Sequence, residues 1–237
     1  MPLSNYLAPS AIAKPGVCTS STRPASPYEG QVIYETDTDR TLVWNGSGWV
    51  FLSTSAAGDV GLVKIVPTGV TGGTLGTDGT ITVGSGVSTI VVNNAFPSSF
   101  ENFRIVFGSI TPSTNHDLYF RLALSGTASV TGYYRGFAYV SLATGAVTGV
   151  GNANIDNHIV SSVTNNAFRH TGIIDVLQPN LAQYTGIVAT SYIMRTDICS
   201  PGVTGSHQIA TAYDGFTILT SSGTVSGGTI RIYGYRN

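Results

Sequence analysis

Charged side chains are scarce in this sequence. Lysine, arginine, aspartate and glutamate make up 10% of its 237 residues, against about a quarter in an ordinary globular domain. Lys14 and Lys64 are the only lysines, and 11 basic against 12 acidic residues give a formal net charge of -1. Because no basic stripe exists, we expect no binding to nucleic acid through its phosphates. A charge this close to zero provides little repulsion between copies, which favours self-association.

Cysteine is equally scarce, since Cys18 and Cys199 are the only two. They form neither a disulfide framework nor a zinc-ligand spacing, and whether they are oxidised stays open. The N-terminus lacks the basic start and apolar run of a secretory signal. The two uncharged stretches of membrane length, Gly79–Phe100 and Gly136–Ile155, are rich in Gly, Ser, Thr and Asn, so we expect no membrane insertion.

Helical periodicity is also missing, because Gly or Pro interrupts nearly every window in which apolar residues could recur at helical spacing. Strand alternation is present instead, as in Phe103, Ile105 and Phe107. The pattern predicts an all-β protein with a C-terminal β-sandwich or jelly roll. The strands expected there are Thr89–Asn93, Asn102–Phe107, Asp117–Leu124, Tyr133–Leu142, Asn157–Val163, Ala167–Leu177, Thr185–Met194, Gln208–Tyr213, Asp214–Thr220 and Thr229–Tyr235.

Four segments follow from composition along the chain. Residues 1–22 form a polar, proline-containing arm that we expect to order by docking. Residues 23–52 predict a small β-meander with strands at Gln31–Glu35, Arg40–Trp44 and Trp49–Leu52, too small to be stable alone. Residues 53–86, rich in Thr and Gly, are interpreted as a flexible linker or as an intertwined stalk. Residues 87–237 form the β-sandwich.

The candidate metal-ligating and catalytic residues lack the sequence motifs of known metal sites and active sites. Glu35, Asp37 and Asp39 alternate as in a calcium loop, but the required glycine and bidentate acid are absent at the sixth and twelfth positions, which favours a turn. Three histidines have an acidic residue nearby in sequence, but no serine-hydrolase elbow, zinc-protease motif or phosphate-binding loop accompanies them. These pairs are His116 with Asp117, His158 with Asp156, and His170 with Asp175. We therefore predict no enzyme activity, no metal site and no cofactor.

Aromatic side chains are the remaining candidates. Tyr34, Trp44 and Trp49 belong to the meander, and we expect them to anchor it on another protein surface. Tyr134 and Tyr213 stand in two aromatic-rich segments and are candidate contacts to sugars of a host envelope. The alternative interpretation places such tyrosines in the sandwich core or in a subunit interface.

The meander segment Thr19–Leu52 resembles a short module of structural proteins from tailed bacteriophages. That module begins R-P-x-x-P-x-x-G-Q-x-I-Y-E-T-D-T and ends W-N-G-x-x-W. The matching residues here are Arg23, Pro24, Pro27, Gly30, Gln31, Ile33, Tyr34, Glu35, Thr36, Asp37 and Thr38, then Trp44, Asn45, Gly46 and Trp49. Residues 89–110 and 211–237 are similar to the opening strands and the closing hairpin of a recurrent phage structural domain.

The resemblance implies a homotrimeric virion protein, exposed on the particle surface and bound to capsid or tail proteins, with no catalytic residues to carry over. We expect a tail-fibre or tail-tip appendage. A head-decoration protein that stabilises the capsid, and a module that binds host glycan, remain the alternatives. The host, the receptor and the copy number stay open.

Overall fold

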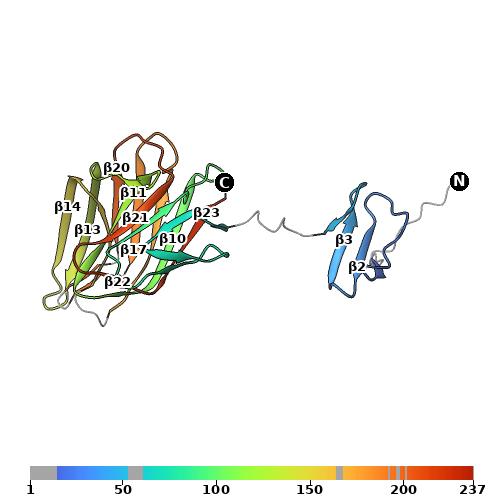
Figure 1. Cartoon of the computed structure of the whole chain (residues 1–237), viewed down its shortest axis with the longest axis horizontal. Helices are drawn as coiled ribbons and strands as arrows, with labels where there is room; N and C mark the ends of the chain where they lie inside the picture. The colour runs from blue at the N-terminus through green and yellow to red at the C-terminus, as the bar shows by residue number, and fades with distance from the viewer. Residues whose placement is uncertain are drawn as a thin grey trace. The chain divides into compact units, whose positions relative to one another are not determined.

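The computed structural model describes residues 15–52, 61–163, 168–191, 193–195, 198–200 and 202–236. The chain divides into two compact units, Met1–Val60 and Gly61–Asn237, and every element of both is a β-strand (Figure 1). The predicted all-β class is therefore confirmed. The described residues contain no helix with the length and hydrophobicity needed to cross a membrane.

The N-terminal unit is a four-stranded sheet in the order β1 (Gly16–Cys18), β2 (Val32–Glu35), β3 (Arg40–Trp44) and β4 (Trp49–Phe51). The strands β2, β3 and β4 form the predicted antiparallel meander. β1 adds to it in parallel, with Val17 opposite Tyr34. The predicted arm over residues 1–22 is thus wrong for 16–18, which belong to the sheet, while 1–14 lie outside the described residues.

The tight turns of this sheet follow from local side-chain chemistry. Between β3 and β4, the side-chain Oδ1 of Asn45 accepts hydrogen bonds from the backbone N–H groups of Ser47, at 3.1 Å, and Gly48, at 2.9 Å. The Asn45 side chain thereby closes the loop. The sequence Asn-Gly suggests a two-residue type I′ hairpin, but Trp44 pairs with Trp49, so four residues form the loop.

The second unit is a β-sandwich with a larger and a smaller sheet. The larger sheet runs through β14 (Val147–Ile155), β13 (Tyr133–Ser141), β20 (Val203–His207), β17 (Thr185–Ser191), β16 (His170–Leu177), β10 (Asn102–Pro112) and β23 (Thr229–Tyr235), and then β5 (Leu62–Ile65) and β8 (Ile81–Val83), both paired with β23, with β7 (Gly73–Leu75) beyond β8. The smaller sheet runs through β15 (His158–Val163), β11 (His116–Leu124), β21 (Gly215–Thr220), β9 (Thr89–Asn93) and β6 (Gly69–Thr71).

Short strands complete this unit. β18 (Ile193–Arg195) pairs with β15, and β19 (Ile198–Ser200) pairs with β13, so this hairpin joins the two sheets along one side. β12 (Thr127–Ala128) pairs with β11, and β22 (Val225–Ser226) pairs with β10. Figure 1 shows β14 at one end of this unit, next to β13.

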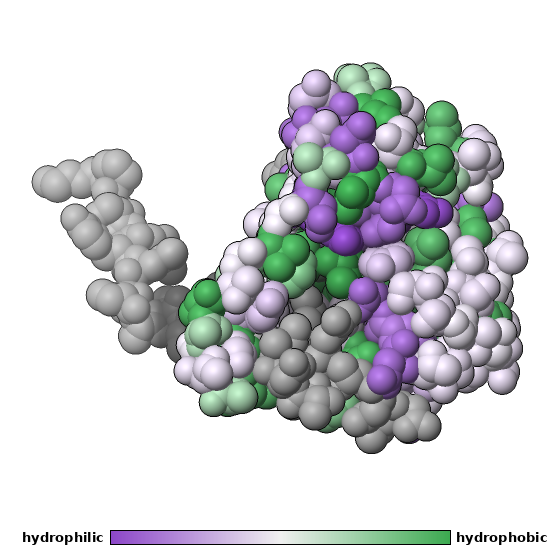
Figure 2. Space-filling view, turned by 90° about the vertical axis from the view of Figure 1, so that its left-hand side faces the viewer, coloured by the Kyte–Doolittle hydropathy of each residue, from purple (hydrophilic) through white to green (hydrophobic). Residues whose placement is uncertain are grey.

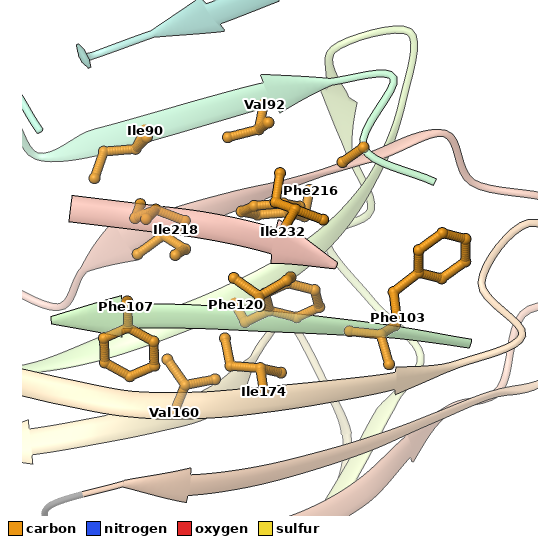
Figure 3. Packing of buried hydrophobic residues seen from close by; sticks show 14 of the residues in the cluster. Ile90, Val92, Phe103, Phe107, Phe120, Val160, Ile174, Phe216, Ile218 and Ile232 are labelled. Carbon is orange, nitrogen blue, oxygen red and sulfur yellow. The ribbon is translucent and has the colours of Figure 1, made fainter. Parts of the chain in front are cut away.

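The core lies between the two sheets. Phe103, Ile105 and Phe107 of β10 are fully buried, which confirms the predicted alternation. They meet side chains of the smaller sheet, where Phe120 stacks against Phe216 with ring centroids 5.6 Å apart (Figure 3). Burial of these large side chains between two layers supplies most of the hydrophobic stabilisation.

The predicted linker or stalk over residues 53–86 is wrong for residues 62–83. These residues form β5 to β8, and Ile65, Ile81 and Val83 are buried in the core. The Thr-Gly steps predicted a linker because their local composition is typical of flexible segments. Hydrogen bonds to β23 and β9 hold these strands in place instead. The sandwich unit therefore begins at residue 61 rather than at 87, and residues 53–60 lie outside the described residues.

One strand prediction also fails in the second unit, and one long strand was missed. Residues 208–213 form no strand, and the strand in this region is β20, immediately before them. β14 was not predicted, because both of its faces are largely exposed and its sequence VTGVGNANI has no apolar alternation. Such a strand is recognisable only by the neighbour that pairs with it.

Candidate functional site

Trp44 and Trp49 stand opposite each other on β3 and β4, and their rings meet edge to face with centroids 5.6 Å apart. Both side chains are half-buried. On β2, the Tyr34 hydroxyl donates a hydrogen bond to the Asp39 carboxylate, which raises the pKa of Tyr34. All three predicted anchoring residues therefore belong to one small sheet. The two tryptophan rings keep part of their surface open to a partner.

Glu35 and Asp37 of this unit have partners within it. The buried Glu35 forms an ion pair with Arg23 and accepts a hydrogen bond from Thr38 Oγ1 at 2.8 Å. Arg23 is the main cause of a lowered Glu35 pKa. Asp37 accepts from the Ser20 N–H at 2.9 Å and from the Ser20 hydroxyl at 2.5 Å. These contacts hold the chain before β2 on the turn after it, and the described residues contain no group of three metal-ligating side chains.

The histidine–carboxylate pairs suggested by sequence proximity do not form hydrogen-bonded pairs. Asp175 is held by Arg104 and by Tyr235, and Asp156 is held by Arg121. His158 Nδ1 contacts the carbonyl oxygen of Ile159 at 2.9 Å instead. None of these three pairs therefore supplies the carboxylate-oriented histidine of a catalytic triad.

Two of the buried histidines, His116 and His170, meet between the sheets. The rings of His116 and His170 stack with centroids 4.9 Å apart, and His170 Nδ1 lies 2.9 Å from Ser161 Oγ. Burial lowers the pKa of His170 to about 3, with a further contribution from His116. Burial likewise lowers the pKa of His158 to about 4. Burial therefore keeps these imidazoles neutral at about pH 7.

The two tyrosines predicted as sugar contacts have different outcomes. Tyr213 is only 5% exposed and packs edge to face on His207, with centroids 5.2 Å apart. Tyr213 therefore belongs to the core, and its prediction as a surface contact is wrong. Tyr134 is half-buried on β13 and lines a depression of about 470 Å³ between β14, β13 and β20.

That depression is one of three that adjoin on the outer face of the larger sheet. A second, of about 300 Å³, shares Gly136 with it and continues over Val188 and Thr204. A third, of about 380 Å³, shares Val188 and reaches Tyr235 on β23. The three depressions are shallow and open; together they cross the sheet from β14 to β23, and we call them the outer-face groove. Six strand spacings correspond to a length of roughly 29 Å.

An ion pair stiffens the β23 end of the outer-face groove. Arg104 Nε and Nη2 both donate to the Asp175 carboxylate at 2.8 Å, and the Tyr235 hydroxyl donates to it at 2.7 Å. The guanidinium also lies 5.3 Å from the centre of the Tyr235 ring. Burial and Asp175 raise the pKa of Tyr235 to about 12. These contacts fix the tyrosine ring at the surface.

Sequence reasoning missed most of this groove, because its lining comes from strands that are far apart in the chain. The available signal was the spacing of Gly149 and Gly151, which places two glycines on one face of a strand. The visible face at the β14 end carries interspersed polar and apolar residues (Figure 2). Comparisons of the chain with family models, with curated proteins and with solved structures found no match.

Proposed function

We propose that this chain is a structural protein of a tailed-bacteriophage virion, a trimeric surface appendage of the tail that is anchored by its N-terminal unit and exposes its β-sandwich. The proposal rests on one observation, which is that the N-terminal unit buries few apolar side chains and exposes more of them. Ile33 and Leu42 are the buried apolar side chains that the described part of this unit contains. Two such residues are far fewer than an independent domain needs.

The described part of the same unit exposes more large apolar side chains than it buries. Its exposed large apolar side chains are Val17, Tyr28, Val50, Phe51 and Leu52, with exposed fractions from 40% to 70%. Exposed apolar residues concentrated on so small a sheet favour docking on another protein. Weak repulsion between copies, at a net charge of -1, supports a homo-oligomer.

Tryptophan fluorescence tests the anchoring without any substitution. Trp44 and Trp49 are the only tryptophans of the chain, so the signal reports on the N-terminal unit alone. We expect the emission maximum to move to shorter wavelength when the purified chain assembles on particles, because the half-exposed rings become buried. An unchanged emission maximum for the particle-bound chain would contradict anchoring through this sheet.

Substitution of both tryptophans tests the same contact. Trp44→Ala combined with Trp49→Ala is expected to weaken attachment by about thirtyfold, the size expected for loss of one aromatic anchor. The measurement is the amount of chain retained on purified particles, and Tyr184→Ala, a 62% exposed tyrosine of the sandwich, is the control. Electron microscopy of particles labelled at the C-terminus distinguishes the tail from the alternative, head decoration. A chain absent from purified particles would exclude both.

A further inference from the structure

Two glycines of the outer-face groove have open space where a side chain would stand. Gly136 of β13 and Gly151 of β14 are paired in register, and neither has a positive φ angle. A Cβ atom at Gly151 would meet nothing within 4 Å, and one at Gly136 would meet only the Val150 carbonyl oxygen, at an ordinary 3.7 Å. Glycine weakens a strand interior by roughly 0.5–1 kcal/mol relative to alanine. The fold itself therefore does not explain these glycines.

Two other glycines beside the groove, Gly205 and Gly202, are explained by the fold. A Cβ at Gly205 of β20 would lie 2.1 Å from the Tyr134 carbonyl oxygen, and one at Gly202 would lie 2.2 Å from the Ala189 carbonyl oxygen. At those positions a side chain would separate neighbouring strands. Gly136 and Gly151 are different, because the space above them is open and forms part of the groove. Glycine in a strand is expected where a ligand approaches the backbone closely.

The chemistry around these glycines is polar and weakly charged. Ser206, Thr204 and Asn152 contribute hydroxyl and amide groups, and Asn152 uses its Oδ1 to accept from Arg135 Nε at 3.2 Å.

Charge in the lining is sparse and spread out. Arg135 and Asp175 are held by partners inside the chain, and Arg236 lies apart from Arg135, at the β23 end. The groove therefore presents hydrogen-bonding groups without a cluster of like charges, which does not suit an anionic ligand.

Aromatic rings lie at both ends of the groove. Tyr134 lines the end at β14, and Tyr235 lines the end at β23, held by Asp175 and Arg104. Apolar side chains between them are few, with Val188 and Leu177 exposed at 39% and 42%. The buried centre of a protein interface is more apolar than the rest of a protein surface. Aromatic surfaces separated by hydroxyl and amide groups suit the mixed polar and apolar faces of sugar rings instead.

We propose that the outer-face groove binds an uncharged oligosaccharide chain, laid across the strands from Tyr134 to Tyr235 over the floor that Gly136 and Gly151 keep open. This binding site does not depend on the virion role, since it lies entirely within the sandwich unit. Gly136 and Gly151 leave room for the oligosaccharide, and the Tyr134 ring stacks on a sugar ring.

Binding of the full-length chain to an array of linear oligosaccharides tests the proposal. The array contains uncharged chains of glucose, mannose or galactose, with sialylated and uronate-containing chains for comparison. We expect the chain to bind at least one uncharged oligosaccharide and to ignore the acidic ones. Gly151→Val is expected to abolish that binding while the melting temperature stays equal or rises, because a β-branched residue favours a strand. Tyr134→Ala is expected to weaken binding about tenfold, the loss of one stacking contact.

Gly108→Val is the matched control. Gly108 is a strand glycine of β10 whose Cβ would also meet nothing within 4 Å, but it does not line the groove. Its substitution should leave sugar binding unchanged. Absence of binding to every uncharged chain, binding to acidic chains alone, or equal loss of binding in Gly108→Val would overturn the proposal. So would a change of oligomeric mass in Gly151→Val, because the occupant of the groove would then be a second copy of the chain.

Discussion

Acidification from about pH 7 to about pH 4.5 is expected to unfold the sandwich unit. All four histidines are buried, and burial lowers the pKa of each of them. The unfolded chain takes up protons below about pH 6.5, the ordinary histidine value, whereas the folded chain resists them down to about 3 for His170 and about 4 for His158. The free energy of unfolding is therefore not reduced by the histidines above about pH 6.5, and it decreases as the pH falls below that value.

The expected loss is large. Each histidine kept neutral in the folded state removes about 1.4 kcal/mol from the free energy of unfolding for each pH unit below its unfolded pKa. Several such residues together approach the whole stability of a domain, about 5–15 kcal/mol. Asp117 beside His116 opposes the effect only in part, since burial remains the first cause. Urea unfolding followed by circular dichroism from about pH 7 to about pH 4.5 measures the slope.

His170→Gln tests whether the buried histidines cause the loss of stability on acidification. Glutamine is uncharged at every pH, so the variant should start less stable than the parent chain, yet lose less stability on acidification. The paired carboxylates, such as Glu35 and Asp175, have lowered pKa values and contribute to acid unfolding only at lower pH. A stability that stayed level between about pH 6.5 and about pH 4.5 would show that the histidines are accessible to protons in the folded chain.

Phe120→Ala is expected to destabilise the sandwich by about 3–5 kcal/mol, through lost burial and the cavity that remains. Phe120 is fully buried, stacks on Phe216 and lies at the centre of the core (Figure 3). The expected fall in melting temperature is about 10 °C for a unit of this size. Differential scanning calorimetry of the full-length chain measures it.

Phe51→Ala is the control for this substitution. The same side chain is removed, but Phe51 of the N-terminal unit is 55% exposed and contacts Arg40 through its ring face. We expect the main calorimetric transition to stay within about 1 °C, because the sandwich has its own core. Equal effects of the two substitutions would mean that the two units unfold as one.

Local patterns were sufficient for several strands that have one buried and one exposed face. Arg40–Trp44, Thr89–Asn93 and Thr229–Tyr235 were predicted with the bounds that the structure has. Their apolar side chains alternate, and that period belongs to the strand itself. The small core of the N-terminal unit was also predictable, because the number of apolar residues limits what so short a segment can bury.

Contacts between distant residues determined the rest. Residues 62–83 are strands because β23, near the other end of the chain, supplies many of their hydrogen bonds, and no local pattern contains that partner. Tyr213 and Tyr134 look equivalent in sequence, yet one is enclosed by the core and the other lines the groove.

The all-β class, the alternating strands and the small N-terminal core could be predicted from residue type and local period. The strand character of the Thr- and Gly-rich segments, the exposure of each tyrosine and the course of the outer-face groove could not. Burial and hydrogen-bond pairing in a sandwich depend on strands brought together from distant parts of the chain, and no local segment contains that information.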